Sequence, residues 1–344
     1  MRFYLFFISL LLVVISCKKD KPIDLYSNQE IQASNHTVLI INEGNYGWGN
    51  ASISLYDPHS NTATYDYYKK QNGNANLGDV CQSVTKYDGS YYLVLNNSNK
   101  IVVVNASDFT KKNTITGFNS PRNLLPVSTN KAYVSDLYAN SIQVVDLNLN
   151  VISSSITCMK GTEEMVYIDN KVFVTNSNSN YCYVINTTSN EVKDSILVGK
   201  GASSIVLDKY SKIWVLSKGS SVNSQLGSLN CINPNTLGIE KKLTCNIGEN
   251  PWRLTINKTR DTLYYLNHGV YQFPINNTSL PLNPLINQGT KLFYGLGINP
   301  NDYSIYVSDA IDYVQKSKIE IYSVNGEFMK SFNSGIISNG FVFE

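Results

Sequence analysis

The stretch Lys131-Ala132-Tyr133-Val134-Ser135-Asp136 decides the fold, because the chain repeats its pattern six more times. In each copy a few β-forming residues run into a short polar residue, which ends the run. The seven polar residues are Asn42, Asn96, Asp136, Asn176, Ser217, Asn267 and Asp309, separated by 54, 40, 40, 41, 50 and 42 residues. A strand-rich period of about 40–45 residues is typical of a β-propeller.

Each repeat contains four strand signals separated by turn residues. The clearest repeat places strands at 123–127, 132–135, 141–145 and 151–156. Asn, Asp, Gly and Pro dominate the intervening turns, where they tolerate left-handed backbone or fix φ. The same order fits the segments 161–199, 202–245, 251–286 and 293–334. The repeat unit is therefore a four-stranded, antiparallel blade.

The two ends of the chain predict how the ring closes. The first copy starts directly with its second strand, at 38–42, and lacks a first strand. The chain finishes with a lone first-strand segment at 339–344. Pairing this C-terminal strand with the three N-terminal strands completes a blade and leaves no open gap in the ring. We therefore predict an all-β, seven-bladed β-propeller over residues 36–344.

The N-terminus reads as a targeting segment. Arg2 precedes an apolar run at 3–15 that is too short for a typical membrane-spanning helix. The run ends in Ser16-Cys17, which resembles the cleavage site of bacterial lipoproteins. The resemblance implies that residues 1–16 are a signal peptide, that Cys17 is lipidated, and that 17–35 form a flexible tether. An ordinary secretory signal is the alternative.

Composition narrows the classes of function. The net charge is +2 and 16% of residues are charged, which gives no basic face for nucleic acid. After cleavage five cysteines would remain: Cys81, Cys158, Cys182, Cys231 and Cys245. An exported chain permits disulfides, and the sequence leaves open whether any pair forms. We expect these cysteines to be small hydrophobic strand residues, and their spacing matches no zinc site.

Enzyme signatures are absent from the sequence. There is no Gly-x-Ser-x-Gly and no His-Glu-x-x-His motif, and the three histidines lie far apart. Glu163 and Glu164 are adjacent in a strand, so their side chains should diverge and should not act as a carboxylate pair. We therefore expect a protein that is not an enzyme, with no metal or cofactor. A propeller hydrolase or lactonase is the weakest alternative.

One face of the propeller should carry function. Loops that join second to third strands emerge on the same face as loops that join successive blades, because strands in a blade alternate in direction. The long connections fall in these two classes, at 42–52, 69–79, 218–227 and 310–318. Elaborated loops on a rigid scaffold usually mark the binding side. We call this the loop-rich face and expect a ligand there.

Residues at the start of each first strand should face this rim. At the aligned position they are Gln82, Arg122, Glu163, Ser203, Trp252, Tyr294 and Asn339, with Glu164 and Arg253 one residue later. Aromatic rings, amides and arginines suit a large polar ligand with flat faces, although each could instead pack within a blade. The predicted ligand-binding residues are Tyr46, Trp48, Asn50, Gln82, Arg122, Glu163, Trp252, Arg253 and Tyr294. We expect the seven polar residues that end the second strands to cap them rather than line the channel.

A family resemblance sharpens the function. The blades lack a Trp-Asp signature and resemble YncE-type seven-bladed propellers. The phrase Asn42-Glu43-Gly44-Asn45 resembles the opening motif of a Bacteroidetes family of surface lipoprotein propellers that includes the cobalamin-binding protein BtuG. The resemblance in architecture extends over the whole mature chain, whereas the resemblance of the specific sequence motif extends over about a dozen residues.

The resemblance implies an outer-membrane lipoprotein, at the cell surface or on the periplasmic leaflet. It implies capture of cobalamin or a related corrinoid and delivery to a TonB-dependent transporter, as a monomer or in complex with that transporter. The alternative is a surface scaffold that binds a protein or a glycan.

Overall fold

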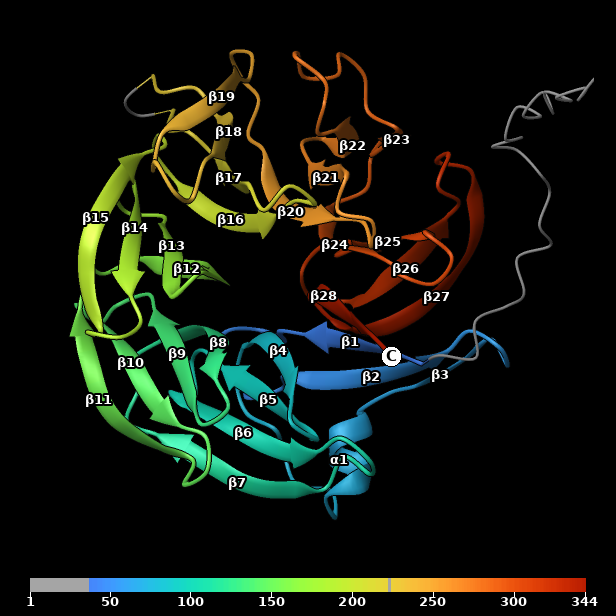
Figure 1. Ribbon diagram of the computed structural model, residues 1–344. Coiled ribbons are helices and arrows are strands. Elements are labelled where there is room, and N and C mark those ends of the chain that lie inside the picture. The colour runs from blue at the N-terminus through green and yellow to red at the C-terminus, as the bar shows by residue number, and fades with distance from the viewer. Residues whose placement is uncertain (1–36, 222–223) are drawn as a thin grey trace, which may run out of the picture. The chain divides into compact units, whose positions relative to one another are not determined.

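Seven four-stranded antiparallel sheets form the blades of a propeller (Figure 1). The computed structural model describes residues 37–221 and 224–344. The first three blades are β28 (Ser338–Phe343), β1 (Val38–Asn42), β2 (Ser52–Asp57) and β3 (Thr62–Thr64); β4 (Cys81–Tyr87), β5 (Ser90–Leu95), β6 (Lys100–Asn105) and β7 (Lys111–Thr116); and β8 (Pro121–Ser128), β9 (Lys131–Asp136), β10 (Ser141–Asp146) and β11 (Val151–Thr157).

The other four blades follow in chain order. They are β12 (Thr162–Ile168), β13 (Lys171–Asn176), β14 (Tyr181–Asn186) and β15 (Glu191–Leu197); β16 (Ala202–Leu207), β17 (Ile213–Ser217), β18 (Ser228–Ile232) and β19 (Ile239–Thr244); β20 (Trp252–Ile256), β21 (Thr262–Leu266), β22 (Gly269–Pro274) and β23 (Ile286–Asn287); and β24 (Phe293–Ile298), β25 (Ile305–Asp309), β26 (Lys316–Tyr322) and β27 (Phe328–Ile336).

The ring closes as the sequence predicts. The C-terminal strand β28 pairs antiparallel with β1, so that Val38 lies opposite Phe343 and Ile40 opposite Phe341. The resulting sheet has the order β28-β1-β2-β3. Both ends of the described chain therefore meet in one blade, which confirms the count of six complete blades and one shared blade.

Burial on both faces explains why the inner strands are continuous apolar runs. All six residues of β5 are buried. Because side chains alternate between the two faces of a strand, Tyr91, Leu93 and Leu95 pack toward blade 1, whereas Tyr92 and Val94 pack toward blade 3. Seven such hydrophobic clusters occur, one between each pair of neighbouring blades. Blade-to-blade packing thus forms a continuous apolar ring.

The polar residues that end the second strands fix the neighbouring loops. Both carboxylate oxygens of Asp136 accept backbone N–H groups, those of Asn119 and Ser120 on one side and those of Tyr138 and Ala139 on the other. None of the seven residues lines the central cavity described below. The predicted cap to the backbone that follows the strand is present at Asp136, Asn176 and Asp309, whereas the side chains of the other four form hydrogen bonds with residues elsewhere in the chain.

The first blade differs from the sequence expectation. The predicted fourth strand at 62–67 stops at Thr64, and a short helix α1 (Tyr67–Gln71) follows. Tyr67 and Tyr68 pack into the hydrophobic cluster between blades 1 and 2, with the Tyr67 ring centroid 5.1 Å from that of Phe109. The two aromatic side chains are therefore used to close a blade interface rather than to extend a strand.

The five described cysteines are free thiols and buried. Cys231 lies opposite Lys241 in its hairpin and not opposite Cys245. Burial raises the pKa of every one of these thiols, as expected of small strand residues. The predicted signal peptide, Cys17 and the tether to residue 35 lie outside the described residues. Within the described ranges, no helix has the length and apolar character needed to cross a bilayer.

Candidate functional site

Every first strand begins with a β-bulge. In β12, Thr162 pairs with Asn176 and Met165 with Val174, so that Glu163 and Glu164 together oppose one residue. The same irregularity recurs in all seven blades. A bulge re-aims side chains, because two consecutive residues no longer alternate across the sheet. We call these residues the first and second bulge positions.

The bulge positions surround a central cavity of about 520 Å³. The first positions are Gln82, Arg122, Glu163, Ser203, Arg253, Tyr294 and Asn339, and the second are Ser83, Asn123, Glu164, Ser204, Leu254, Gly295 and Gly340. All seven residues at the first position and six of the seven at the second, all but Gly295, line the cavity. The fold thus delivers two rings of side chains to its centre.

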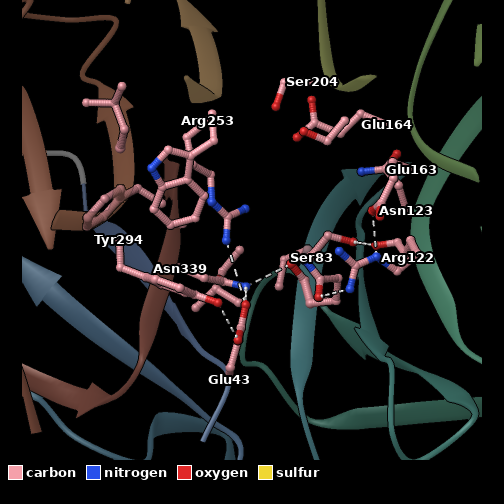
Figure 2. A pocket seen from close by; sticks show the side chains of 18 of the residues that line it. Glu43, Ser83, Arg122, Asn123, Glu163, Glu164, Ser204, Arg253, Tyr294 and Asn339 are labelled. Atoms are coloured by element: carbon pink, nitrogen blue, oxygen red, sulfur yellow. Dashed lines mark hydrogen bonds and ion pairs between the residues drawn. The ribbon is translucent and has the colours of Figure 1, made fainter. Parts of the chain in front are cut away.

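The bulges overturn two details of the sequence prediction. Glu163 and Glu164 do not diverge, because the bulge directs both into the same cavity (Figure 2). Gln82 is the extra residue of β4, as the predicted alignment requires, but the bulge of β20 falls on Arg253 and Leu254, one residue after the predicted Trp252. Strict two-residue periodicity fails wherever one strand of a pair gains an extra residue.

Arg122 is held from two sides. Its Nε donates to Glu163 Oε2 at 2.6 Å, and its Nη1 donates to the side-chain oxygen of Gln82. The other carboxylate oxygen of Glu163 accepts the hydroxyl of Ser177 at 3.1 Å. These three predicted residues therefore form one network along the wall of blades 2–4.

A second network includes a residue that the prediction missed. The hydroxyl of Tyr294 donates to Glu43 Oε2 at 3.0 Å, and Asn339 Nδ2 donates to Glu43 Oε1 at 2.8 Å (Figure 2). Arg253 Nη2 lies 3.7 Å from Glu43 Oε1, within ion-pair distance but too far for a hydrogen bond. Glu43 follows the strand-ending Asn42, and this place in the repeat was the available signal.

Arg253 is stacked rather than hydrogen-bonded. Its guanidinium carbon lies 5.3 Å from the Trp252 ring centroid and 5.4 Å from that of Tyr294. The backbone at Arg253 is left-handed, with φ of 56°, as a result of the bulge. Its Nε is buried and has no hydrogen-bond partner among the described residues.

Glu164 is a carboxyl group of the cavity whose pKa is raised. Burial raises its pKa to about 7, although Arg253 and the backbone N–H of Ile205, which donates to Oε2 at 3.2 Å, oppose the rise. Its side chain projects into the cavity on the wall opposite Glu43 (Figure 2). The carboxyl therefore changes charge near neutral pH.

The loop at 43–51 forms part of the rim. Gly44 must be glycine, since φ is +74° and a Cβ would lie 2.4 Å from Asn50 Oδ1. Asn50 Oδ1 accepts the N–H of Asn45 at 2.7 Å, and the Asn45 amide donates to the carbonyl of Tyr313 at 2.6 Å. On the other side, the N–H of Gly47 donates to Asp79 at 2.8 Å. The loop is therefore anchored to both neighbouring blades.

Seven of the nine predicted ligand-binding residues line the central cavity. Trp48 and Asn50 do not. They border a separate hollow of about 330 Å³ beside α1, where the Trp48 side chain is 78% exposed. The described residues contain no group of three or more His, Cys, Asp or Glu side chains arranged to hold a metal ion.

Comparison with known proteins identifies the family. Residues 36–343 match the family model described as a domain of unknown function, DUF5074. The chain belongs to the DUF5074 family. Among curated proteins, none matches this DUF5074 protein.

Solved structures share the fold of the DUF5074 chain at low sequence identity. A quinonprotein alcohol dehydrogenase-like protein of Bacteroides thetaiotaomicron is 15% identical, with a TM-score of 0.71 over 90% of this chain and 78% of its own. The periplasmic gluconolactonase of Pseudomonas aeruginosa is 10% identical, with a TM-score of 0.68 over 90% and 98%. A putative 6-phosphogluconolactonase of Bacteroides fragilis is 12% identical, with a TM-score of 0.66 over 90% and 98%. Identities this low show the fold alone.

Proposed function

We propose that this DUF5074 protein is a binding protein that captures a ligand at its loop-rich face. The proposal rests on the central cavity of about 520 Å³, because all seven blades direct polar groups into it. A concave site with a few convergent polar groups on a rigid scaffold is the usual form of a small-molecule site. The cross-linked loop at 43–51 supports binding with little reordering.

The rim supports a ligand larger than the cavity. Tyr46, at 76% exposure, stands at the mouth, and Tyr313 packs edge-on against Tyr294 at 5.7 Å between ring centroids. A neighbouring groove of about 1100 Å³ shares Ser203 and Trp252 with the cavity. A ligand could insert one polar group and rest flat faces on the surrounding rings.

A corrinoid such as cobalamin is the ligand we propose. It combines a large flat ring system with polar side groups, which suit the cavity and its aromatic rim, and the opening motif at 42–45 resembles that of a family of surface lipoproteins that includes a cobalamin-binding member. In this proposal Cys17 carries the lipid anchor at the outer membrane, and the loop-rich face passes its ligand to a TonB-dependent transporter.

Titration of the purified protein with cyanocobalamin, followed by calorimetry, tests this function. We expect saturable binding in the micromolar range or tighter, weakened by Tyr46→Ala at the mouth. Tyr210→Ala is the matched control, because Tyr210 is also exposed, at 59%, but lies in the β16–β17 turn on the opposite face. Absence of binding at micromolar concentrations, or equal weakening by both variants, would contradict the corrinoid proposal.

A protein- or glycan-binding scaffold is the second function that a specific observation favours. Ile247 and Val314 are apolar, 91% and 68% exposed, and lie in loops of the loop-rich face outside the central cavity. Exposed apolar groups at a rim suit contact with another macromolecule. This scaffold is the function that remains if cyanocobalamin does not bind.

We propose that the protein is not an enzyme, and the convergence of Glu163 and Glu164 makes this worth testing. Glu163 is engaged by Arg122 and Ser177, so it is held as a structural partner. Incubation with D-glucono-1,5-lactone should give no hydrolysis above the spontaneous rate. Turnover that is lost in Glu164→Gln would instead establish the hydrolase alternative.

A further inference from the structure

We propose that the central cavity holds a carboxylate group of its ligand against the guanidinium of Arg253. The inference deepens the binding function proposed above and rests on it. It names the chemical group that the cavity recognises, and it rests on ligand binding at this face rather than on cobalamin, whose side groups are amides and a phosphodiester and not free carboxylates.

Arg253 has donors without acceptors. Its sole polar partner among the described residues is Glu43, at 3.7 Å, and its buried Nε has none. By contrast, Arg122 on the facing wall donates to both Glu163 and Gln82. A buried unpaired N–H is costly, and a planar guanidinium fork fits a carboxylate with two parallel bonds. An oxyanion against Arg253 would supply the missing acceptors.

The stacking of Arg253 prepares it for this contact. The guanidinium carbon lies 5.3 Å from the Trp252 ring centroid and 5.4 Å from that of Tyr294, so two cation–π contacts position the group before any ligand arrives. Rings attract the cation without using its N–H donors. The edge of the fork therefore stays available for hydrogen bonds.

A free hydrogen-bond acceptor and open space lie in the same cavity as the Arg253 guanidinium. Asn339 is 3% exposed and its Oδ1 has no partner, although the residue lines the cavity. The neighbouring Gly340 lines the cavity, and a Cβ there would meet only the Ile41 side chain, at 3.4 Å. The ligand should therefore carry hydroxyl or amide donors next to its carboxylate, on the side of Asn339 and Gly340.

The charge of the cavity opposes a bound monoanion least at low pH. Arg122 and Arg253 face Glu43, Glu163 and Glu164, with the Tyr294 hydroxyl also in this set. The two arginines offset two glutamates, so the charge of the cavity depends on Glu164. Burial raises the pKa of Glu164 to about 7, and its ionisation would set a second negative charge beside the bound carboxylate. Affinity should therefore fall as pH rises through 7.

The experiment compares two matched probes, D-gluconate and D-glucitol, which differ in the carboxylate. Calorimetric titration at pH 6 should show gluconate binding roughly tenfold more tightly than glucitol, as expected of charge-assisted hydrogen bonds. Arg253→Gln should abolish this preference. Arg260→Gln is the control, because Arg260 is an exposed arginine in the β20–β21 turn at the opposite end of the blade.

Equal affinity for the two probes, or a preference that survives Arg253→Gln, would overturn the carboxylate site. The variant Glu164→Gln gives a second route should Arg253→Gln fail to fold. It should bind gluconate with an affinity that no longer changes between pH 6 and 8, whereas an unaltered pH dependence would count against the proposal. If cyanocobalamin does not bind, the corrinoid proposal is rejected and the carboxylate site is not. If gluconate does not bind, the carboxylate site is rejected and the corrinoid proposal is not.

Discussion

Residues that line the central cavity affect both the stability of the fold and the proposed binding of the ligand. Arg122 and Glu163 satisfy each other, whereas Arg253 and Glu164 are each left incompletely paired. Incomplete pairing of buried polar groups lowers stability, and folded proteins keep it mostly where a ligand or reaction supplies the partner. These two residues are therefore the most informative positions for substitution.

Glu164→Gln should stabilise the protein at high pH. Burial raises the pKa of Glu164 to about 7, so the folded state holds a proton that the unfolded state releases near its ordinary value of 4.5. Stability of the wild-type chain should then fall as pH rises from about 4.5 to 7. The variant should exceed it by about 3 kcal/mol at most above pH 7 and by nothing below pH 4.

Denaturant unfolding of both proteins at pH 4 and pH 8 measures this difference. A stability gap of the same size at both pH values would show that Glu164 does not titrate between the two states.

Substitution of Trp48 and of Trp252 should change the stability of the protein by different amounts. Trp48 is 78% exposed, so Trp48→Ala should change the free energy of unfolding by less than about 0.5 kcal/mol. Trp252 packs against Tyr294 at 5.1 Å between ring centroids and against the cluster between blades 6 and 7. Trp252→Ala should cost roughly 2 kcal/mol, since half-buried aromatic contacts are lost. Thermal unfolding checks both, and equal losses would contradict the assigned positions.

At the scale of elements, the β-bulge determines what the cavity contains. Strand order, turn positions and ring closure follow from the repeats, because alternation and turn chemistry are local properties of the sequence. The bulge is not local, since it depends on how two strands pair. For this reason seven of the nine predicted ligand-binding residues line one cavity, whereas the prediction wrongly separated Glu163 from Glu164 and overlooked Glu43.

Deletion of a bulge residue should be tolerated, whereas deletion from a regular strand should not. Removing Ser203 from β16 would leave regular pairing, because Ala202 and Ser204 already oppose the neighbouring residues Ser217 and Leu216. We expect a loss of about 1–2 kcal/mol in the free energy of unfolding.

Removing Val206 from the same strand provides the matched control. The deletion forces one side of β16 to slip by a residue, which turns its side chains to the opposite face, and should cost more than about 3 kcal/mol. Similar stability of the two deletion variants in denaturant would contradict the assigned register.

At the scale of the whole molecule, β28 holds the ring closed. Its Phe341 and Phe343 rings contact Tyr306 of blade 7 edge-on, at 5.6 and 5.1 Å between centroids, while its backbone pairs with β1 of blade 1. Truncation after residue 337 should remove both contacts and open the apolar ring. We expect loss of a single cooperative unfolding transition, monitored by circular dichroism.

Deletion of Glu344 alone is the control for this truncation. It removes the ion pair with Lys86 and the hydrogen bond from Tyr91 at the end of β28, and should cost about 1 kcal/mol. A truncated chain that unfolds as cooperatively as this control would show that closure does not depend on β28.

The central claim is that the bulges of seven blades build one binding site around Arg253. A crystal structure of the protein soaked in D-gluconate tests it most directly. We predict density for a carboxylate within hydrogen-bonding distance of the Arg253 guanidinium, with the hydroxyl chain on the side of Asn339 and Gly340. An empty central cavity at saturating gluconate, or gluconate bound only on the outer strands, would contradict the claim.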